Sequence, residues 1–284
     1  MKLRHLLLSS LIILAAACSK DDGDDVEIRH YIPSTEYAKR LEVPALLSNG
    51  TTQFISHSTV INGDTVMTYC LEYDLTRNHS RWVAFRFDGL TRKIDSQRSD
   101  TWADDPELNS QYHIGAGTFT GGVRGHICAS HDRRYSQQAN MQTFYMTNMT
   151  PMNYDFNGDY WTAFESHVQS LGRNTSFADT LYVVKGGTLL NTKGTAWSSA
   201  GKAMPIPAYY FIALLKVKAG QYKSIGFWIE HKDYGRDGTS SDVRAAAVKI
   251  DKLEELTRID FFPNLRDDLE TTVESSYSLS EWQL

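Results

Sequence analysis

The most informative stretch of the sequence is Gly121-Gly-Val-Arg-Gly-His-Ile-Cys-Ala-Ser-His-Asp-Arg-Arg134, followed downstream by Asp155-Phe-Asn-Gly-Asp-Tyr-Trp-Thr-Ala-Phe-Glu165. The first segment places His126 after a glycine bend, and the second places Asn157 ahead of a helix that carries Glu165. A neutral histidine can take a proton from an attacking water. An amide oxygen can bind Mg²⁺ directly, and a carboxylate can hold the water shell of the ion. These are the parts that metal-assisted cleavage of a phosphodiester requires.

The same region predicts two short strands and a helix. Glycines surround Thr118-Phe-Thr120 and predict a short strand there, with the strand of His126 after it. A helix is expected from about Gly158 to Leu171, with Gly172 as its stop. Its apolar residues are spaced so that they form one stripe: Trp161, Phe164, Val168 and Leu171. Together these elements outline a ββα unit.

The rest of the chain predicts a sheet. Strands are expected at residues 53–60, 65–73, 81–87, 181–187, 209–217 and 224–230, with a further candidate at 242–251. A short helix is expected at 252–257, followed by an irregular plug at 259–265. No repeat or linker follows Val26. We therefore expect one α+β domain on a mixed, largely antiparallel sheet.

The N-terminus predicts a lipoprotein. Residues 1–17 have the positive start and the short apolar run of a signal peptide, and small residues precede Cys18. We expect Cys18 to be acylated, residues 18–25 to form an acidic tether, and residues 26–284 to form the folded domain. An acidic run after the cysteine occurs in lipoproteins displayed on the outer membrane, which is the expected location. An ordinary signal peptide is the alternative.

Cysteine content and charge leave two questions open. Cys70 and Cys128 could pair in an exported protein, or remain two separate buried thiols. The net charge is −5, and it is still −4 without the first 25 residues, which hold three basic and four acidic side chains. Because Lys and Arg normally dominate affinity for phosphate, a basic groove must be assembled in three dimensions, or binding is weak and catalysis depends on a metal.

The order Arg124-Gly-His126, Asn157 and Glu165 resembles the non-specific DNA/RNA endonucleases of the ββα-metal type, which include Serratia-type nucleases and endonuclease G. The strand Trp82-Val-Ala-Phe85 and the plug at 259–265 resemble the family as well. The resemblance implies a ββα-metal fold, with helices flanking the central sheet. It also implies an endonuclease that uses Mg²⁺, or Mn²⁺ in its place, to hydrolyse DNA and RNA.

The resemblance assigns a role to each matched residue. His126 is the expected general base, Asn157 the metal ligand, and Glu165 a ligand through water. Arg124 is expected to contact the phosphate. Asn148 matches a Ser-Asn segment of the family and is expected at the substrate. With the unperturbed histidine pKa of about 6.5, activity should fall below that pH.

In the family pattern, a second arginine lies two residues before an aromatic residue, which Trp102 matches in this chain. Asp100 holds that position here, and the nearest arginine, Arg98, is the candidate for the role on the phosphate and in catalysis. The alternative is that this role is lost and that Arg98 is a solvated charge of the loop. The sequence departs from the family pattern at two further positions. Val123 replaces the aspartate of Asp-Arg-Gly-His, and Met152 replaces a frequent glutamine.

Two alternatives stay open. The departures allow a weakened, nuclease-like surface lipoprotein that binds nucleic acid or another polymer without cutting it. A zinc or thiol hydrolase built on His126, Cys128 and His131 is the other alternative. It lacks an H-E-x-x-H or a paired C-x-x-C motif, and no base is indicated for a cysteine nucleophile.

Overall fold

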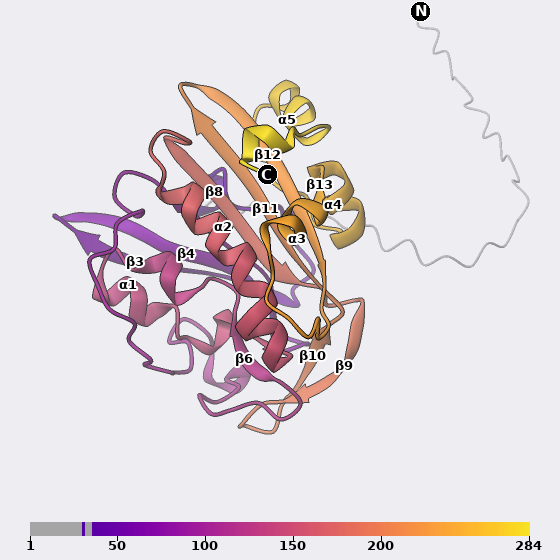
Figure 1. Cartoon of the computed structure of the whole chain (residues 1–284). Coiled ribbons are helices and arrows are strands. Elements are labelled where there is room, and N and C mark those ends of the chain that lie inside the picture. Colours follow the sequence, from indigo (N-terminus) through magenta and orange to yellow (C-terminus); the bar gives the residue numbers. More distant parts are fainter. Residues whose placement is uncertain (1–29, 32–35) are drawn as a thin grey trace, which may run out of the picture.

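The computed structural model describes residues 30–31 and 36–284 (Figure 1). The predicted signal peptide, Cys18 and the predicted acidic tether therefore lie outside the described residues. Within the described part of the chain, no helix has the length and apolar character needed to cross a membrane.

A seven-stranded sheet forms the centre of the molecule (Figure 1), in the order β13-β12-β11-β8-β5-β4-β3, and each neighbouring pair is antiparallel. Its strands are β3 (Thr52–Ile61), β4 (Asp64–Asp74), β5 (His79–Phe87), β8 (Thr180–Gly187), β11 (Tyr209–Lys218), β12 (Gln221–Glu230) and β13 (Ala247–Val248). The β3–β4 turn has positive φ at Asn62 and Gly63, as a two-residue hairpin with this strand twist requires. The strands predicted from alternating apolar residues are confirmed.

The alternation of side chains gives the sheet two apolar faces. On the first, here called the α2 face, Val83 and Phe85 pack with the helix α2 (Trp161–Arg173). On the second, the α4–α5 face, Trp82 and Ala84 belong to the core that includes α4 (Ile250–Thr257) and α5 (Asp267–Glu274). Each large side chain buried in these cores contributes about 1.5–3 kcal/mol.

The two cysteines lie in different cores. Cys70 belongs to the core of the α4–α5 face, and Cys128 to that of the α2 face. Both are buried free thiols. The sheet separates them, which rules out the disulfide and supports the interpretation of two separate buried cysteines.

The ββα unit differs from the prediction in its first strand. The strand of His126, β6 (Val123–His126), pairs with β7 (Met149–Met152), and α2 follows β7. Residues 118–120 form no strand, because Thr120 makes only an isolated bridge to Trp197 and Gly121 then turns the chain with a φ of 93°. The predicted strand at 118–120 is therefore wrong, and β7 is the second strand of the unit.

The helix after β7 begins earlier than predicted. Asn153 accepts a hydrogen bond from the Phe156 amide at 3.0 Å and caps the first turn. A π-helical turn, Phe156–Tyr160, then leads into α2. The predicted apolar stripe of α2 is buried, as expected. Gly172 does not stop the helix: a Cβ there would lie 2.3 Å from the Phe87 ring, so the glycine permits close packing on β5.

The remaining elements are short. Of the strand predicted at 242–251 only Ala247–Val248 forms, as β13. Thr239 and Asp242 form a capping box that begins α3 (Ser240–Ala245), so the start of the segment is helical. The plug at 259–265 is irregular and packs on the α4–α5 face, as predicted. Two further hairpin-like pairs and one helix complete the fold: β1 (His30–Tyr31) with β2 (Leu46–Leu47), β9 (Thr192–Trp197) with β10 (Ala203–Pro207), and α1 (Gln137–Gln142).

Candidate active site

His126 ends β6, directly opposite Met149 of β7. Its ring packs against Phe144 and Trp102, with centroid separations of 4.9 and 5.4 Å. Nε2 is buried and has no hydrogen-bond partner within the described residues, whereas Nδ1 is not enclosed. Burial, and next the positive charge of Arg98, lower the pKa of His126 to about 3. The imidazole is therefore neutral near pH 7 and can accept a proton.

Asn157 lies on the π-helical turn, next to the backbone of β6. Its Oδ1 would be 3.1 Å from a Cβ built on Gly125, the residue before His126. The glycine thus permits the close approach of the amide to this strand. No hydrogen bond occupies the Asn157 side chain within the part of the chain that the structure describes, because Asn153 serves as the helix cap. A π-helical turn is rare, and such turns are frequent at functional sites.

Glu165 lies on α2, the helix that follows the π-helical turn of Asn157, and its side chain is half-buried. Its Oε1 accepts a hydrogen bond from Trp161 Nε1 at 3.0 Å, one helical turn earlier. Burial raises the pKa of Glu165 to about 7, although the positive charge of Lys185 opposes the shift. The second carboxylate oxygen has no hydrogen bond within the described residues. A carboxylate in this state can accept a cation or a hydrated cation.

The rings beside His126 also hold the two arginines. The Arg124 guanidinium lies 3.7 Å from the Trp102 ring centroid and donates to the Ala116 carbonyl at 2.6 Å. The Arg98 guanidinium lies 4.8 Å from the centroid of Phe144. Cation–π contacts of this kind fix a guanidinium but leave some of its N–H donors for a phosphate.

Asp100 limits the freedom of Arg98. Its carboxylate accepts a hydrogen bond from Arg98 Nε at 2.8 Å, and both side chains are exposed. Arg98 lies near the histidine, because both side chains pack against the Phe144 ring. The loop that carries both residues has no regular structure, as expected.

Asn148 does not have the predicted substrate contact. It is fully buried, its Oδ1 accepts from the Cys128 amide, and its Nδ2 donates to the carbonyls of Cys128 and Thr143, all within 2.8 Å. No polar atom is left for a ligand. Asn148 instead fixes the backbone two residues after His126, which makes it a positioning residue.

The sequence interpretation missed the buried ion pair behind the site. Lys185 Nζ lies 2.8 Å from Asp132 Oδ2, and both side chains are fully buried. Asp132 also accepts from the Ala129 amide and from Gln169 of α2. The pair thus joins β8, the turn after β6 and α2. A lysine inside the apolar strand 181–187 was the available signal.

The residues of the zinc or thiol alternative do not converge. His131 is exposed and its carbonyl accepts from Arg173, so its position is structural. Burial raises the pKa of the Cys128 thiol far above its usual range, which keeps it protonated and a poor nucleophile. Neither observation supports that alternative.

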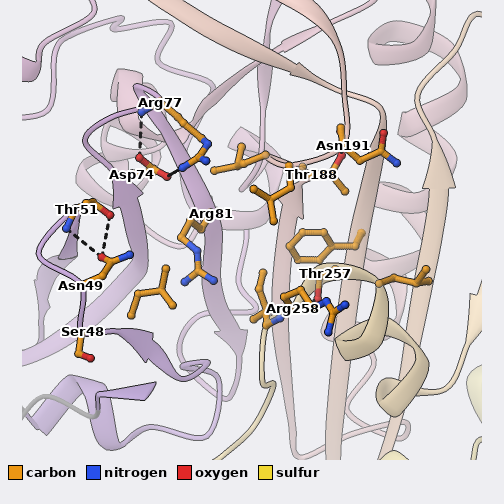
Figure 2. A pocket seen from close by; sticks show the side chains of 17 residues that line it. Ser48, Asn49, Thr51, Asp74, Arg77, Arg81, Thr188, Asn191, Thr257 and Arg258 are labelled. Atoms are coloured by element: carbon orange, nitrogen blue, oxygen red, sulfur yellow. Dashed lines mark hydrogen bonds and ion pairs between the residues drawn. The ribbon is translucent and has the colours of Figure 1, made fainter. Parts of the chain in front are cut away.

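A separate cavity lies on the α4–α5 face. It has a volume of about 500 Å³ and contains Arg77, Arg81 and Arg258 (Figure 2), together with apolar side chains such as Phe211. Arg77 is paired with Asp74 at 2.7 Å, and Arg81 with Glu72. None of the predicted site residues lines this cavity, and two of its three arginines are already neutralised, so it is not the site described above.

Comparison with known sequences now identifies the family. The sequence pattern of the DNA/RNA non-specific endonucleases matches residues 50–268, which is most of the chain. The chain belongs to the DNA/RNA non-specific endonuclease family. This family assignment makes the protein a hydrolytic nuclease with nucleic acid as its substrate, and the predicted class of enzyme is confirmed.

Curated relatives of this endonuclease have similar names. A "Nuclease" of Nostoc sp. (strain PCC 7120) is 27% identical over 94% of this chain and 96% of its own length. The mitochondrial nuclease EXOG of Xenopus laevis is 25% identical over 71% of this chain, which spans only 58% of that relative. Human mitochondrial endonuclease G is 26% identical over 70% of this chain and 68% of its own length.

The fold of the endonuclease is also found among solved structures. A chain in the crystal structure of the EndoG/EndoGI complex aligns with a TM-score of 0.58 and 19% identity, over 76% of this chain and 89% of that chain. At this identity the likeness concerns the fold. It confirms the predicted α+β, ββα-metal architecture.

Proposed function

We propose that this endonuclease hydrolyses DNA and RNA with a divalent cation, Mg²⁺ or Mn²⁺, that is bound by Asn157, and with His126 as the general base. The observation that supports the proposal best is the approach of Asn157 Oδ1, which has no hydrogen bond among the described residues, to Gly125, immediately before His126. A base and a cation site must meet at one scissile phosphate, and Asn157 approaches the strand that carries the proposed base.

The residues present fit a hard cation. Asn157 offers a neutral oxygen with no competing hydrogen bond within the described residues, and Glu165 offers one free carboxylate oxygen. One direct protein ligand with a carboxylate near the water shell suits Mg²⁺, which gives up its waters reluctantly. When bound there, such an ion stabilises charge on the phosphoryl group and on the leaving oxygen.

The protein residues would divide the remaining work. His126 is neutral because of its lowered pKa, and Nδ1 is the nitrogen we assign as proton acceptor, since Nε2 is enclosed. Arg124 and Arg98 would bind non-bridging oxygens of the phosphate, each held by an aromatic ring. Glu165 would orient metal-bound water while Trp161 fixes its other oxygen.

Asn157→Ala tests the cation site. The variant should lose cleavage of plasmid DNA and of RNA in Mg²⁺ while it keeps its fold, because no apolar core residue changes. Asn153→Ala is the matched control: it removes the helix cap and about 1 kcal/mol of stability, but it should retain activity at a temperature where it is folded. Wild-type cleavage that persists in EDTA would overturn the proposal.

One observation favours a second candidate, a surface protein that binds a polymer and cuts it poorly. The two departures from the family pattern, Val123 and Met152, are direct cross-strand partners. Relative to the family pattern, an apolar pair thus stands in place of two polar side chains beside Arg124. Tight binding of a nucleic-acid fragment by the wild type, without cleavage in Mg²⁺ or Mn²⁺, would favour this candidate.

We further propose that the enzyme is an envelope lipoprotein, acylated at Cys18 and held at the outer membrane by that lipid alone. The residues before and at Cys18 support this, since they combine a signal-peptide pattern with a cysteine after small residues.

A further inference from the structure

Three carboxylates gather between α4 and α5, on the face of the sheet opposite the active site. Asp251 and Glu254 are the second and fifth residues of α4, and Glu274 is the last residue of α5. Ligand oxygens of the three side chains all lie within 4.8 Å of one another. Ser224 of β12 donates a hydrogen bond to the Val273 carbonyl and holds the end of α5 in place.

Glu274 is the least compensated of the three. It is 6% exposed, and its Oε1 is buried with no hydrogen-bond partner within the part of the chain that the structure describes. A buried carboxylate without a partner is costly. Its place at the end of α5 adds the negative pole of that helix to the same spot.

The other two carboxylates are only partly neutralised. Glu254 Oε1 accepts from the Phe261 amide at 2.7 Å, and Asp251 pairs with Lys249 at 2.9 Å. Burial, and then the neighbouring carboxylates, raise the pKa of Glu274 to about 9, while burial also raises that of Glu254 to about 7. The cluster therefore needs either protons or a cation.

The geometry suits a large cation. Ca²⁺ takes oxygen ligands at about 2.3–2.6 Å, so oxygens on opposite sides of the ion are about 4.6–5.2 Å apart. The carboxylate oxygens here, within 4.8 Å of one another, can share such an ion. Mg²⁺ requires about 2.0–2.1 Å and near-ideal octahedral geometry, which a site made of two side chains from one helix and one from another supplies less readily.

We propose that Asp251, Glu254 and Glu274 form a Ca²⁺ site, separate from the catalytic centre, that fastens α5 to α4 against β12. An ion there would give Glu274 the partner it lacks. Since the catalytic residues lie on the other face of the sheet, the site would act on stability and not on the reaction.

The experiment measures thermal unfolding in an Asn157→Ala background, which removes the catalytic cation site. At neutral pH, a Ca²⁺ concentration about 100-fold above its Kd should raise Tm by about 5–10 °C over the value in EDTA. The added substitution Glu274→Gln should abolish this shift. Because Gln removes the buried charge, it should leave Tm in EDTA unchanged or higher. Glu255→Gln, on the exposed side of α4 and paired with Lys252, should keep the full shift.

Three results would overturn the proposal. The first is the absence of a Tm shift up to about 10 mM Ca²⁺. This concentration exceeds the Kd of weak extracellular sites, roughly 10⁻⁴–10⁻³ M. Such a result would mean that the carboxylates share protons and bind no cation. Another is an equal shift in Glu274→Gln, which would assign the effect to surface binding. The third is a lower Tm of Glu274→Gln in EDTA, which would mean that the carboxyl group already stabilises the fold without an ion. Calorimetric titration should find one Ca²⁺ per chain in the Asn157→Ala protein.

Discussion

His126 and Glu165 have pKa values shifted in opposite directions. Burial and Arg98 bring the pKa of His126 down to about 3, so this imidazole stays neutral in mildly acidic solution. The expected loss of activity below pH 6.5 was based on an unperturbed histidine, and the environment of His126 removes that basis. Burial instead brings the pKa of Glu165 up to about 7. This group is an uncharged acid below pH 7 and a carboxylate above it.

We therefore predict that kcat/KM rises with pH through a midpoint near 7 at low Mg²⁺. The midpoint should move to lower pH as Mg²⁺ increases, because the proton and the cation compete for one carboxylate. Glu165→Gln should abolish the step and reduce activity about 10- to 100-fold, as for other groups behind a metal. Profiles of both proteins at two Mg²⁺ concentrations are the measurement; an unchanged step in Glu165→Gln would assign it to another group.

A second prediction concerns the base itself. General-base catalysis supplies about 10²–10⁴-fold, so His126→Ala should lose at least that much in kcat. Its affinity for DNA should change little, because Arg98, Arg124 and Asn157 remain. His126→Asn keeps more of the packing against Phe144 and should be equally impaired. The exposed His131→Ala is the control with normal activity, and near-normal cleavage by folded His126→Ala would refute the assignment.

At the scale of elements, the spacing of apolar residues predicted those helices and strands whose burial is set by their own sequence. The stripe of α2 and the alternation in β4 and β5 reflect burial that each segment has by itself. The partner of β6 could not be predicted in the same way, because β7 is four residues long, contains Pro151 and shows no alternation. The misassigned segment at 242–251 has a similar cause, since a side-chain cap at Thr239 outweighs its apolar residues.

The same distinction applies to the candidate site: residues in a local motif could be predicted, and contacts between distant segments could not. The motif singled out His126, Asn157 and Glu165 as candidates, because the order of these residue types can be read from the sequence. The groups that hold them were not predictable in this way. Trp102 reaches Arg124 from another loop, and Lys185 reaches Asp132 from another strand. Only Trp161, four residues before Glu165 on one helix, could have been found from spacing.

The hairpin β9–β10 supports a third prediction. Trp197 ends β9, is 50% exposed, and exchanges backbone hydrogen bonds with Thr120, near the start of β6. With a net charge of −5, the enzyme needs a source of affinity besides phosphate contacts, and an exposed indole can stack on bases. Trp197→Ala should weaken binding to single-stranded DNA or RNA by about 1–3 kcal/mol.

The measurement is binding to a fluorescent oligonucleotide with the catalytic cation withheld. Leu190→Ala is the matched control, because Leu190 is an exposed apolar residue, 77% accessible, that lines the cavity on the α4–α5 face. It should bind like the wild type. Equal affinity of Trp197→Ala would mean that the hairpin does not contact the substrate.

At the scale of the whole molecule, the two faces of the sheet separate the N-terminal end from the site. β1 pairs with β2, and Leu46 of β2 packs in the core of the α4–α5 face, whereas the proposed catalytic residues lie on the α2 face. The first described strand of the chain thus joins the sheet on the side opposite the proposed catalytic residues.

The fourth prediction follows from this arrangement. Cys18→Ala should move the protein from the membrane fraction to the soluble fraction, because the proposed lipid is its anchor and no helix among the described residues could span a membrane. Its kcat on DNA should match that of the wild type. Cys70→Ala, a change of a buried thiol, should leave the protein in the membrane fraction. Tight membrane association of Cys18→Ala would refute acylation as the anchor.

The pairing of β5 with β8 has a consequence for how this enzyme can vary. Residues 88–179 connect these two adjacent strands, and every residue proposed for catalysis lies within this segment. The hydrogen bonds between β5 and β8 hold the two ends of the segment 88–179 side by side. The proposed catalytic residues therefore lie on one long loop that is closed by this strand pair. Substitutions and insertions inside the loop can change rate or substrate while the order of the strands outside it stays the same. The catalytic segment 88–179 can therefore change in sequence at a different rate from the strands of the sheet.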